Sequence, residues 1–316
     1  MTTTTPSSPE NPRPKVSVCV VTYNQEKYIA QCLQSLVDQE TDFPFEIIVG
    51  DDCSTDSTRA IVSDFATQYP NIIRPVLREK NIGPAKNYID VHSLARGDYV
   101  AHVDGDDYAL PGKLAAQVAL LNSFPEVALS VHAVEVVGQK RCIGSSVDLP
   151  EWGDMRALLK LGTYFVNSST MYRAINAFDH EGVVDIIDYC SHIEQASRGT
   201  IHLNKNCLGA YRWHADGVSK SEAYRSKIEL AYGAAFDRAI ELGASLADVK
   251  AGRLIRHKSF AISRLVAGDK NGFFRLISLG GGDWFYATWT HRVIFLLKWF
   301  FATKYGVAFV KRHIMA

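Results

Sequence analysis

Three carboxylates occupy four residues in the segment Asp104-Gly105-Asp106-Asp107, which contains a D-x-D pattern. Like charges this close repel one another, so ionising all three calls for a counter-cation. Carboxylate oxygens suit Mg²⁺ or Mn²⁺, which often bridge protein carboxylates to substrate phosphates. The segment therefore indicates a divalent-metal site that holds a phosphate-bearing molecule. The alternative is a solvated turn, because aspartate and glycine are common in turns.

Two further polar clusters follow apolar runs. The loop at 22–25 follows Val16–Val21, and the pair Asp51-Asp52 follows Phe45–Val49. A carboxylate after a strand can accept a hydrogen bond from a ribose hydroxyl or a base N–H. An aromatic ring such as that of Tyr23 can stack on a nucleobase; the alternative is packing beside a sheet.

The apolar runs alternate with amphipathic segments. Val16–Val21, Phe45–Val49 and Tyr99–Val103 have the near-continuous apolar composition of strands buried on both faces, whereas 28–37 and 61–69 show helical spacing. This alternation predicts an α/β fold with a Rossmann-like, doubly wound and mainly parallel sheet. Ligands bind at the carboxyl ends of such strands, so the three polar clusters are expected to converge on one cleft.

Residues 16–121 resemble the nucleotide-binding half of a family 2 glycosyltransferase with the GT-A fold. The matching segments are Val18–Asn24, Asp51–Asp56, Asn81–Asn87 and Asp104–Asp107, and their order and spacing together carry the resemblance. Cys53 replaces the glycine that is usual in the second segment.

The resemblance implies a role for individual residues of this half. Tyr23 would stack on the base, Asp52 would bond a base N–H, and Asp104 would contact ribose or metal. Asp106 would bind the metal, with Asp107 as a second ligand or a partner of one. The full nucleotide-binding set is Thr22, Tyr23, Asn24, Asp52, Lys86, Asn87 and Asp104; Lys86 stands where an arginine is common.

The second half resembles the family more loosely. Asn167–Arg173 is similar to a strand that lines the cleft, and Asp185–Tyr189 occupies the place of the element that supplies the general base. The resemblance implies Asp188 as the base, with Asp185 as a rival; a helix N-terminal carboxylate favoured by the dipole is the alternative for either. Tyr211–His214 resembles the segment near the diphosphate and metal, which implies Arg212 beside the diphosphate and His214 as a third metal ligand.

The chain divides into three regions. Residues 1–14 are rich in threonine, serine and proline and are expected to be a disordered tail. Residues 15–218 form the predicted GT-A catalytic domain, with a nucleotide-binding half at 15–121 and an acceptor half at 122–218. Residues 219–316 are predicted to be a helical C-terminal extension.

Charge and cysteine content narrow the classes of partner and compartment. The 34 basic residues equal the 34 acidic ones, so the chain gives no global signal for nucleic acid. The six cysteines form no Cys-x-x-Cys pair and are scattered among apolar runs. They are expected to be buried free thiols in a reducing compartment, which favours a cytoplasmic location.

The C-terminal stretch 284–316 contains ten aromatic and five basic residues but no acidic one. Its apolar stretch falls short of the roughly 20 residues that a spanning helix requires. A basic, aromatic helix can instead lie on an anionic leaflet, here the inner face of the cell membrane. Packing on the catalytic domain or a dimer contact are the alternatives.

These features together predict a metal-dependent, inverting glycosyltransferase. It would move a sugar from a nucleoside-diphosphate-sugar to a hydroxyl of a saccharide or lipid-linked saccharide, in polysaccharide or lipopolysaccharide assembly. The resemblance favours UDP, with GDP and dTDP open. The alternatives are a non-catalytic nucleotide-sugar binding protein and a nucleotidyltransferase. The second is disfavoured because the loop at 22–25 lacks glycine.

Overall fold

The computed structural model describes residues 13–176, 188–213, 222–269 and 271–272. They belong to two compact units. The described residues within Met1–Leu158 and Thr163–Gly243 form the first, and those within Leu159–Gly162 and Ala244–Ala316 form the second. The predicted domain boundary at residue 218 lies inside the first unit.

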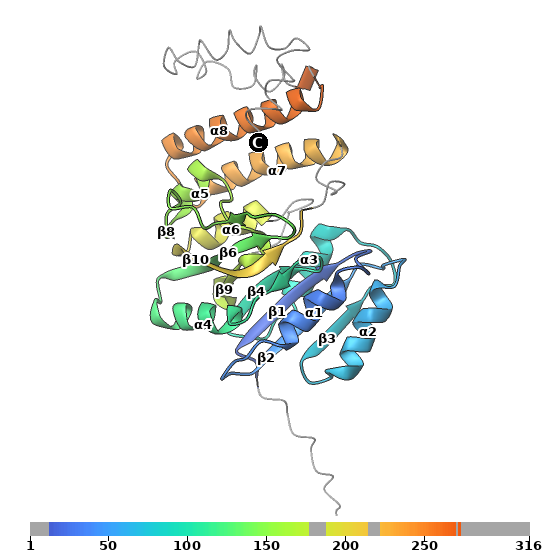
Figure 1. The fold of residues 1–316 in the computed structure, drawn as a ribbon. Coiled ribbons are helices and arrows are strands. Elements are labelled where there is room, and N and C mark those ends of the chain that lie inside the picture. Colours follow the sequence, from blue (N-terminus) through green and yellow to red (C-terminus); the bar gives the residue numbers. More distant parts are fainter. Residues whose placement is uncertain (1–12, 177–187, 214–221, 270, 273–316) are drawn as a thin grey trace, which may run out of the picture. The chain divides into compact units, whose positions relative to one another are not determined.

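A ten-stranded sheet organises the first unit (Figure 1). Its main path runs β3-β2-β1-β4-β9-β6-β10-β5, with β7 paired to β6 and β8 paired to β10. The pairs among β1 to β4 and the pair β6–β10 are parallel, whereas β9 runs antiparallel to both β4 and β6. The predicted mainly parallel α/β sheet is confirmed. The strands are β1 (Val16–Thr22), β2 (Phe45–Asp51), β3 (Ile73–Leu77), β4 (Tyr99–Asp104), β5 (Tyr108–Ala109), β6 (Val127–Val136), β7 (Cys142–Ile143), β8 (Trp152–Gly153), β9 (Met171–Arg173) and β10 (Thr200–Tyr211).

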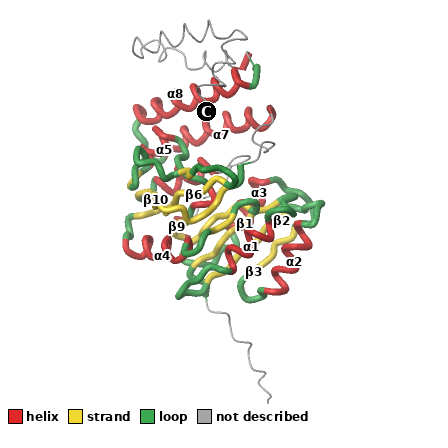
Figure 2. The backbone as a smooth tube through the Cα atoms, viewed as in Figure 1, coloured by secondary structure: helices red, strands yellow, loops and turns green. Residues whose placement is uncertain are grey.

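Helices cover the sheet (Figure 2). One face of β1 and β2, with Val18, Val20 and Ile47, packs with the apolar side of α1 in the main core. The alternate residues face α3, where a Cβ on Gly50 would collide with Val91. Burial on both faces explains the near-continuous apolar runs. The helices are α1 (Ile29–Val37), α2 (Thr58–Gln68), α3 (Pro84–His92), α4 (Lys113–Ser123), α5 (Met155–Leu161), α6 (Asp188–Ala196), α7 (Glu222–Glu241) and α8 (Leu246–Val266), with 3-10 turns η1 (Asn167–Ser169) and η2 (Ala174–Asn176).

Strand β10 is longer than the sequence pattern indicates. The pattern predicts a strand over 208–213, but β10 begins at Thr200 and ends at Tyr211. Its register against β6 shifts between Asn204 and Cys207 and again before Gly209. Such irregularities break the period-2 alternation by which a strand is recognised, which explains the missed first half.

Strand β3 forms one edge of the sheet. Ile72 O accepts from Ile47 N at 2.8 Å, and Arg78 N donates to Asp51 O at 3.0 Å. Backbone groups alternate in direction along a strand, so the intervening even-numbered residues face β2 and position 75 faces outward. Pro75 therefore lies where its missing N–H would have pointed away from the sheet.

The expectation of six free thiols is wrong for two cysteines. Cys142 in β7 and Cys207 in β10 form a disulfide at a sequence separation of 65. Cys19, Cys32 and Cys190 are buried free thiols, and Cys53 is a half-buried one. Cysteine spacing in the sequence could not predict this pair. The two cysteines come close only in the fold, where β7 and β10 both pair with β6.

No helix in the described part of the chain is long and apolar enough to cross a membrane. The basic, aromatic stretch 284–316 lies outside the described residues, so its expected membrane contact stays a prediction.

The disulfide predicts a redox-dependent stability. Replacing Cys142 by Ser should lower the free energy of unfolding by about 2–4 kcal/mol, because the bridge restricts a long loop of the unfolded chain. Urea denaturation without reductant measures the loss, and the same comparison in reductant, where the difference should vanish, is the control. Alkylation of six thiols in the unreduced, denatured protein would contradict the bridge.

Candidate active site

The carboxyl ends of β1, β2 and β4 lie side by side. Thr22 is in register with Asp51, and Val21 is in register with Asp104. The backbone continues this alignment, since Asp52 N donates to Thr22 O at 3.0 Å. The three polar clusters therefore lie at one edge of the sheet, whereas their expected convergence on one cleft stays a prediction.

The loop after β1 presents one aromatic ring to solvent. The Tyr23 side chain is 46% exposed, whereas Thr22 is buried. Asn24 fixes the loop, because its Oδ1 accepts from Thr55 N at 2.8 Å and its backbone N donates to Ser54 Oγ at 2.9 Å. The ring of Tyr23 is therefore available for stacking on a planar ligand.

The carboxylate of Asp52 is committed to the protein. It is buried, and its two oxygens accept from Ile82 N at 2.7 Å and Gly83 N at 2.9 Å. Asp52 thus fastens the loop before α3 to the end of β2. Each oxygen retains a second lone pair, so a contact with a base N–H would add to this role and not replace it.

Two residues with side chains adopt positive φ angles in the described chain, and both line this edge. They are Asn24, at 52°, and Cys53, at 61°. Asparagine tolerates the left-handed region, but cysteine does so at a cost. The left-handed angle is a physical reason for the glycine usual at the position of Cys53.

Lys86 and Asn87 face different surroundings on α3. Lys86 is exposed and its Nζ lies 3.1 Å from Asp90 Oδ1. Asn87 is buried and its Nδ2 donates to Gly50 O at 2.8 Å. Lys86 can reach a ligand by leaving a surface ion pair, whereas Asn87 holds α3 against β2.

Asp104 is held from both sides. Its Oδ1 lies 3.1 Å from Nε2 of the buried His102, and its Oδ2 lies 3.2 Å from Oγ of Ser168. Burial acts to raise the pKa of Asp104, but His102, then Ser168, and Lys113 hold that pKa below its ordinary value. The side chain is 38% exposed, so its carboxylate remains open on one side.

Asp107 lies deeper than its neighbours. It is 1% exposed, and its oxygens accept from Ser168 Oγ at 2.6 Å and Arg212 N at 2.9 Å. Burial, followed by the charges of Asp104 and Asp106, raises the pKa of Asp107 to about 8. These contacts favour Asp107 as a partner of the metal-binding residues, buried behind Asp104 and Asp106, over a direct ligand role.

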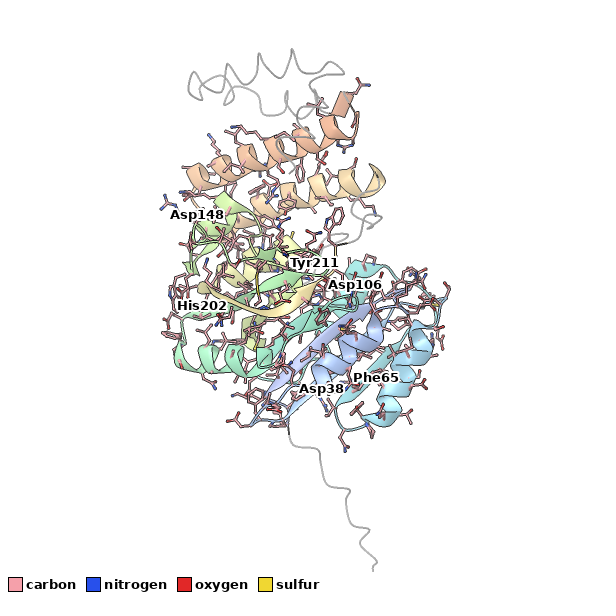
Figure 3. The ribbon with its side chains drawn as sticks, in the orientation of Figure 1. Asp38, Phe65, Asp106, Asp148, His202 and Tyr211 are labelled. Atoms are coloured by element: carbon pink, nitrogen blue, oxygen red, sulfur yellow. A yellow bond between two sulfur atoms is a disulfide. The ribbon has the colours of Figure 1, made fainter. Side chains whose placement is uncertain are left out.

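Arg212 follows the end of β10 and joins this strand to the acidic segment. Its Nη1 donates to the carbonyl oxygen of Asp106, and its guanidinium lies 4.9 Å and 5.1 Å from the ring centres of Tyr28 and Tyr108. Tyr211, labelled near Asp106 in Figure 3, is also within electrostatic reach of Asp106. Cation–π contacts with these two aromatic rings thus hold the positive charge of Arg212 beside the carboxylates.

Asp188 begins α6 and is exposed to solvent. Partial desolvation by the surrounding protein, and then the charge of Asp104, raise the pKa of Asp188 to about 6. Its charge also acts on Tyr88, which bonds Ser191. The structure therefore brings Asp188 within electrostatic reach of the acidic segment. The predicted rival base Asp185 and the predicted ligand His214 lie outside the described residues.

A family model for glycosyl transferase family 2 matches residues 17–191, which is more than half of the chain. The chain belongs to this family. An uncharacterised protein of Mycobacterium tuberculosis (strain H37Rv) is 37% identical over 207 residues, which cover 64% of this chain and 60% of that protein. The chain thus spans about three fifths of the length of this curated relative.

TarS of Staphylococcus aureus, a poly(ribitol-phosphate) β-N-acetylglucosaminyltransferase, is 44% identical over 128 residues, or 40% of this chain and 22% of that protein. The structure of TarS 1–349 in complex with UDP-GlcNAc aligns with a TM-score of 0.57 and 22% identity, covering 88% of this chain and 77% of that one. The mannosyltransferase PcManGT from Pyrobaculum calidifontis, in complex with GDP-Man and Mn²⁺, aligns with a TM-score of 0.56 and 19% identity, covering 96% and 88%. These two solved structures share the fold.

The predicted set of site residues leaves out three residues at this edge, although one of them, Ser168, lies in the segment Asn167–Arg173 that was expected to line the cleft. They are His102 and Ser168, which contact Asp104, and Lys113, whose Nζ donates to Ser168 O from a fully buried position. The sequence does offer a signal for Lys113. It is a lysine in the first turn of an apolar helix, where the helix dipole disfavours a cation, so its position there indicates a role other than helix stabilisation.

The acidic segment of this family 2 chain fits a cation shared with a ligand better than an all-protein metal cage. Within the described residues, no group of three or more His, Cys, Asp or Glu side chains is arranged to hold a metal. Mg²⁺ is commonly bound by one or two carboxylates together with substrate phosphates. Asp104, open on one side, and the half-buried Asp106 match that requirement.

Gly105 allows the acidic segment to approach the loop after β1. A Cβ at this position would lie 2.8 Å from Thr22 Cβ and 2.5 Å from Gln25 Oε1. We expect Gly105→Ala to destabilise the fold by about 1–3 kcal/mol through this overpacking and to weaken nucleotide binding.

A glycine in open space provides the control for Gly105. Gly233 lies within α7, and a Cβ added there would meet no atom within 4 Å, so Gly233→Ala should be neutral or stabilising by up to about 1 kcal/mol. Thermal unfolding and calorimetry measure both variants. Equal behaviour of the two would contradict the close approach at Gly105.

Proposed function

We propose that this chain is a glycosyltransferase that moves a sugar from a nucleoside-diphosphate-sugar to an acceptor hydroxyl. The observation that carries the proposal is the strand register, which sets the acidic segment Asp104–Asp107 beside the polar end of β1, with the polar end of β2 next along the same edge of the sheet. Membership of family 2 and the similarity to TarS support the same reaction class.

The donor is proposed to be a UDP-sugar. The complex of TarS with UDP-GlcNAc supports this choice, and the complex of PcManGT with GDP-Man makes GDP the first alternative. Tyr23 would stack on the base, with Thr22, Asn24 and Asp52 around it. Asp104, Lys86 and Asn87 would complete the nucleotide-binding set. Lys86 would bind the nucleotide through its positive charge, and Asn87 would act by fixing α3.

A divalent cation, Mn²⁺ or Mg²⁺, is proposed to bind at Asp106 and Asp104, with His214 as the predicted further ligand. When bound, the cation would neutralise the charge that the diphosphate gains as it leaves. The Mn²⁺ complex of PcManGT supports this choice of metal. The guanidinium of Arg212, fixed beside Asp106, would add a second positive charge to the same region.

Asp188 is proposed to be the general base of an inverting transfer. The acceptor oxygen would attack the anomeric carbon as the bond from that carbon to the diphosphate oxygen breaks, and the acceptor proton would move to the Asp188 carboxylate. A pKa of about 6 leaves this carboxylate ionised at neutral pH. Attack opposite the leaving group inverts the configuration.

The acceptor is proposed to be a saccharide or a lipid-linked saccharide of a surface polysaccharide or lipopolysaccharide. The name of TarS, which acts on poly(ribitol-phosphate), supports a polymer acceptor. A location at the inner face of the cell membrane stays part of the proposal, because the stretch 284–316 that suggests it lies outside the described residues. The cytoplasmic part of the proposal rests on the free thiols of Cys19, Cys32, Cys53 and Cys190.

Calorimetric titration with UDP, GDP and dTDP, each with and without Mn²⁺, tests the donor site. We expect Mn²⁺-dependent binding of UDP, which Asp106→Ala should weaken at least about tenfold because a carboxylate ligand is lost. Preference for GDP or dTDP would change the donor class. Absence of binding by every nucleotide would refute the donor site.

Replacing Asp188 by Asn tests the base. The variant should bind UDP and Mn²⁺ like the wild type and lose about 10²–10⁴-fold in kcat, because it cannot accept the proton. In the wild type, kcat/KM should rise about tenfold per pH unit below about 6 and level off above it, since the ionised form of Asp188 is the active one.

The exposed Asp148, labelled in Figure 3, provides a matched control, because Asp148→Asn makes the same chemical change away from the cleft. This variant should keep full activity. A fully active Asp188→Asn would exclude Asp188 as the base. A wild type that binds nucleotide but never turns over any donor would favour a non-catalytic nucleotide-sugar binding protein.

A further inference from the structure

We propose that Ser168 is a positioning residue that presets the carboxylates of Asp104 and Asp107 for a divalent cation, and that the buried Lys113 holds Ser168 in place. The inference rests on the proposed metal-dependent function. It assigns roles to two residues that lie outside the predicted nucleotide, metal and base set.

The Ser168 hydroxyl lies between two carboxylates. It is buried in η1, 2.6 Å from Asp107 Oδ2 and 3.2 Å from Asp104 Oδ2, and it accepts from Asp104 N at 3.0 Å. A hydroxyl has one proton and two acceptor lone pairs. Its one proton can bond either carboxylate, at Asp107 Oδ2 or at Asp104 Oδ2, while the Asp104 N–H fixes the hydroxyl from the other side. One group therefore sets the spacing of two acidic side chains.

The contact with His102 completes the orientation of Asp104. Nε2 of this fully buried histidine lies 3.1 Å from Asp104 Oδ1, opposite the contact with Ser168. Both oxygens of Asp104 thus have a protein neighbour, and the side chain turns its remaining open side to solvent. A carboxylate held in this way needs little reordering when a cation binds, which is how neighbours of metal ligands raise metal affinity.

Two side chains of α4 hold η1 in place through hydrogen bonds to its backbone. Lys113 is 1% exposed and its Nζ donates to Ser168 O, while Gln117 Nε2 donates to Ser169 O at 2.9 Å. The charges of Asp104 and Asp107 act on the Lys113 ammonium. Lys113 therefore holds Ser168 in position. It also offsets part of the negative charge of Asp104 and Asp107, the two residues that Ser168 contacts.

Ser169 offers a matched control one residue away. It belongs to the same turn and is fully buried, and its hydroxyl donates to Val166 O at 2.6 Å. A purely structural role for serine hydroxyls in η1 would affect both positions alike. Of these two serines, only Ser168 contacts the acidic segment through its side chain in the described structure.

The experiment compares Ser168→Ala, Ser168→Thr and Ser169→Ala. Free Mn²⁺ is measured by electron paramagnetic resonance during titration of each protein in the presence of UDP, and thermal unfolding is recorded in parallel. We expect Ser168→Ala to weaken Mn²⁺ binding about 10–100-fold and Ser168→Thr to restore most of it, because the hydroxyl returns. Ser169→Ala should lower the melting temperature but leave Mn²⁺ affinity within about twofold of the wild type.

Unchanged Mn²⁺ affinity in Ser168→Ala, or an equal loss in Ser169→Ala, would overturn the role of Ser168. Lys113→Met keeps the volume and removes the ammonium; unchanged Mn²⁺ affinity in this variant would overturn the role of Lys113. A wild type that does not bind Mn²⁺ with UDP would refute the proposed function, and this inference with it. Failure of the variants alone leaves the proposed function standing.

Discussion

Mutual repulsion of three carboxylates in four residues is the constraint around which this edge of the sheet is organised. Asp104 and Asp107 share the hydroxyl of Ser168, His102 contacts Asp104, and Arg212 binds the backbone of Asp106. Each partner comes from a different element, so the acidic segment acquires its geometry only after β4, η1 and β10 have assembled. The proposed cation would be the last component of a charge balance that the protein alone leaves incomplete.

The sequence was sufficient to predict the part of the fold that brings the clusters together. Val16–Val21 and Tyr99–Val103 are near-continuous apolar runs because β1 and β4 are buried on both faces. Their polar ends meet because parallel strands end at the same edge. The irregular β10 was only half visible, since its register shifts interrupt the alternation on which strand prediction depends.

The supporting residues were beyond prediction for a different reason. Ser168 and Cys207 act on partners more than 60 residues away in sequence, and serine and cysteine are compatible with many environments. Conversely, Asp52 and Asn87 were predicted as ligand contacts, and in the structure their side chains bond the protein's own backbone. A motif identifies where a polar residue is needed, but the folded chain decides how much of that residue remains for a ligand.

The proline at the free edge of the sheet limits how molecules of this protein can associate. Edge strands recruit strands of other chains through their outward N–H and C=O groups. At Pro75 one outward donor is missing, and the exposed Arg74 precedes it. An incoming strand along β3 would lose a hydrogen bond at the middle of the ladder. Any oligomer of this chain is therefore expected to use a surface other than sheet extension at β3, and this edge is protected against fibrous aggregation.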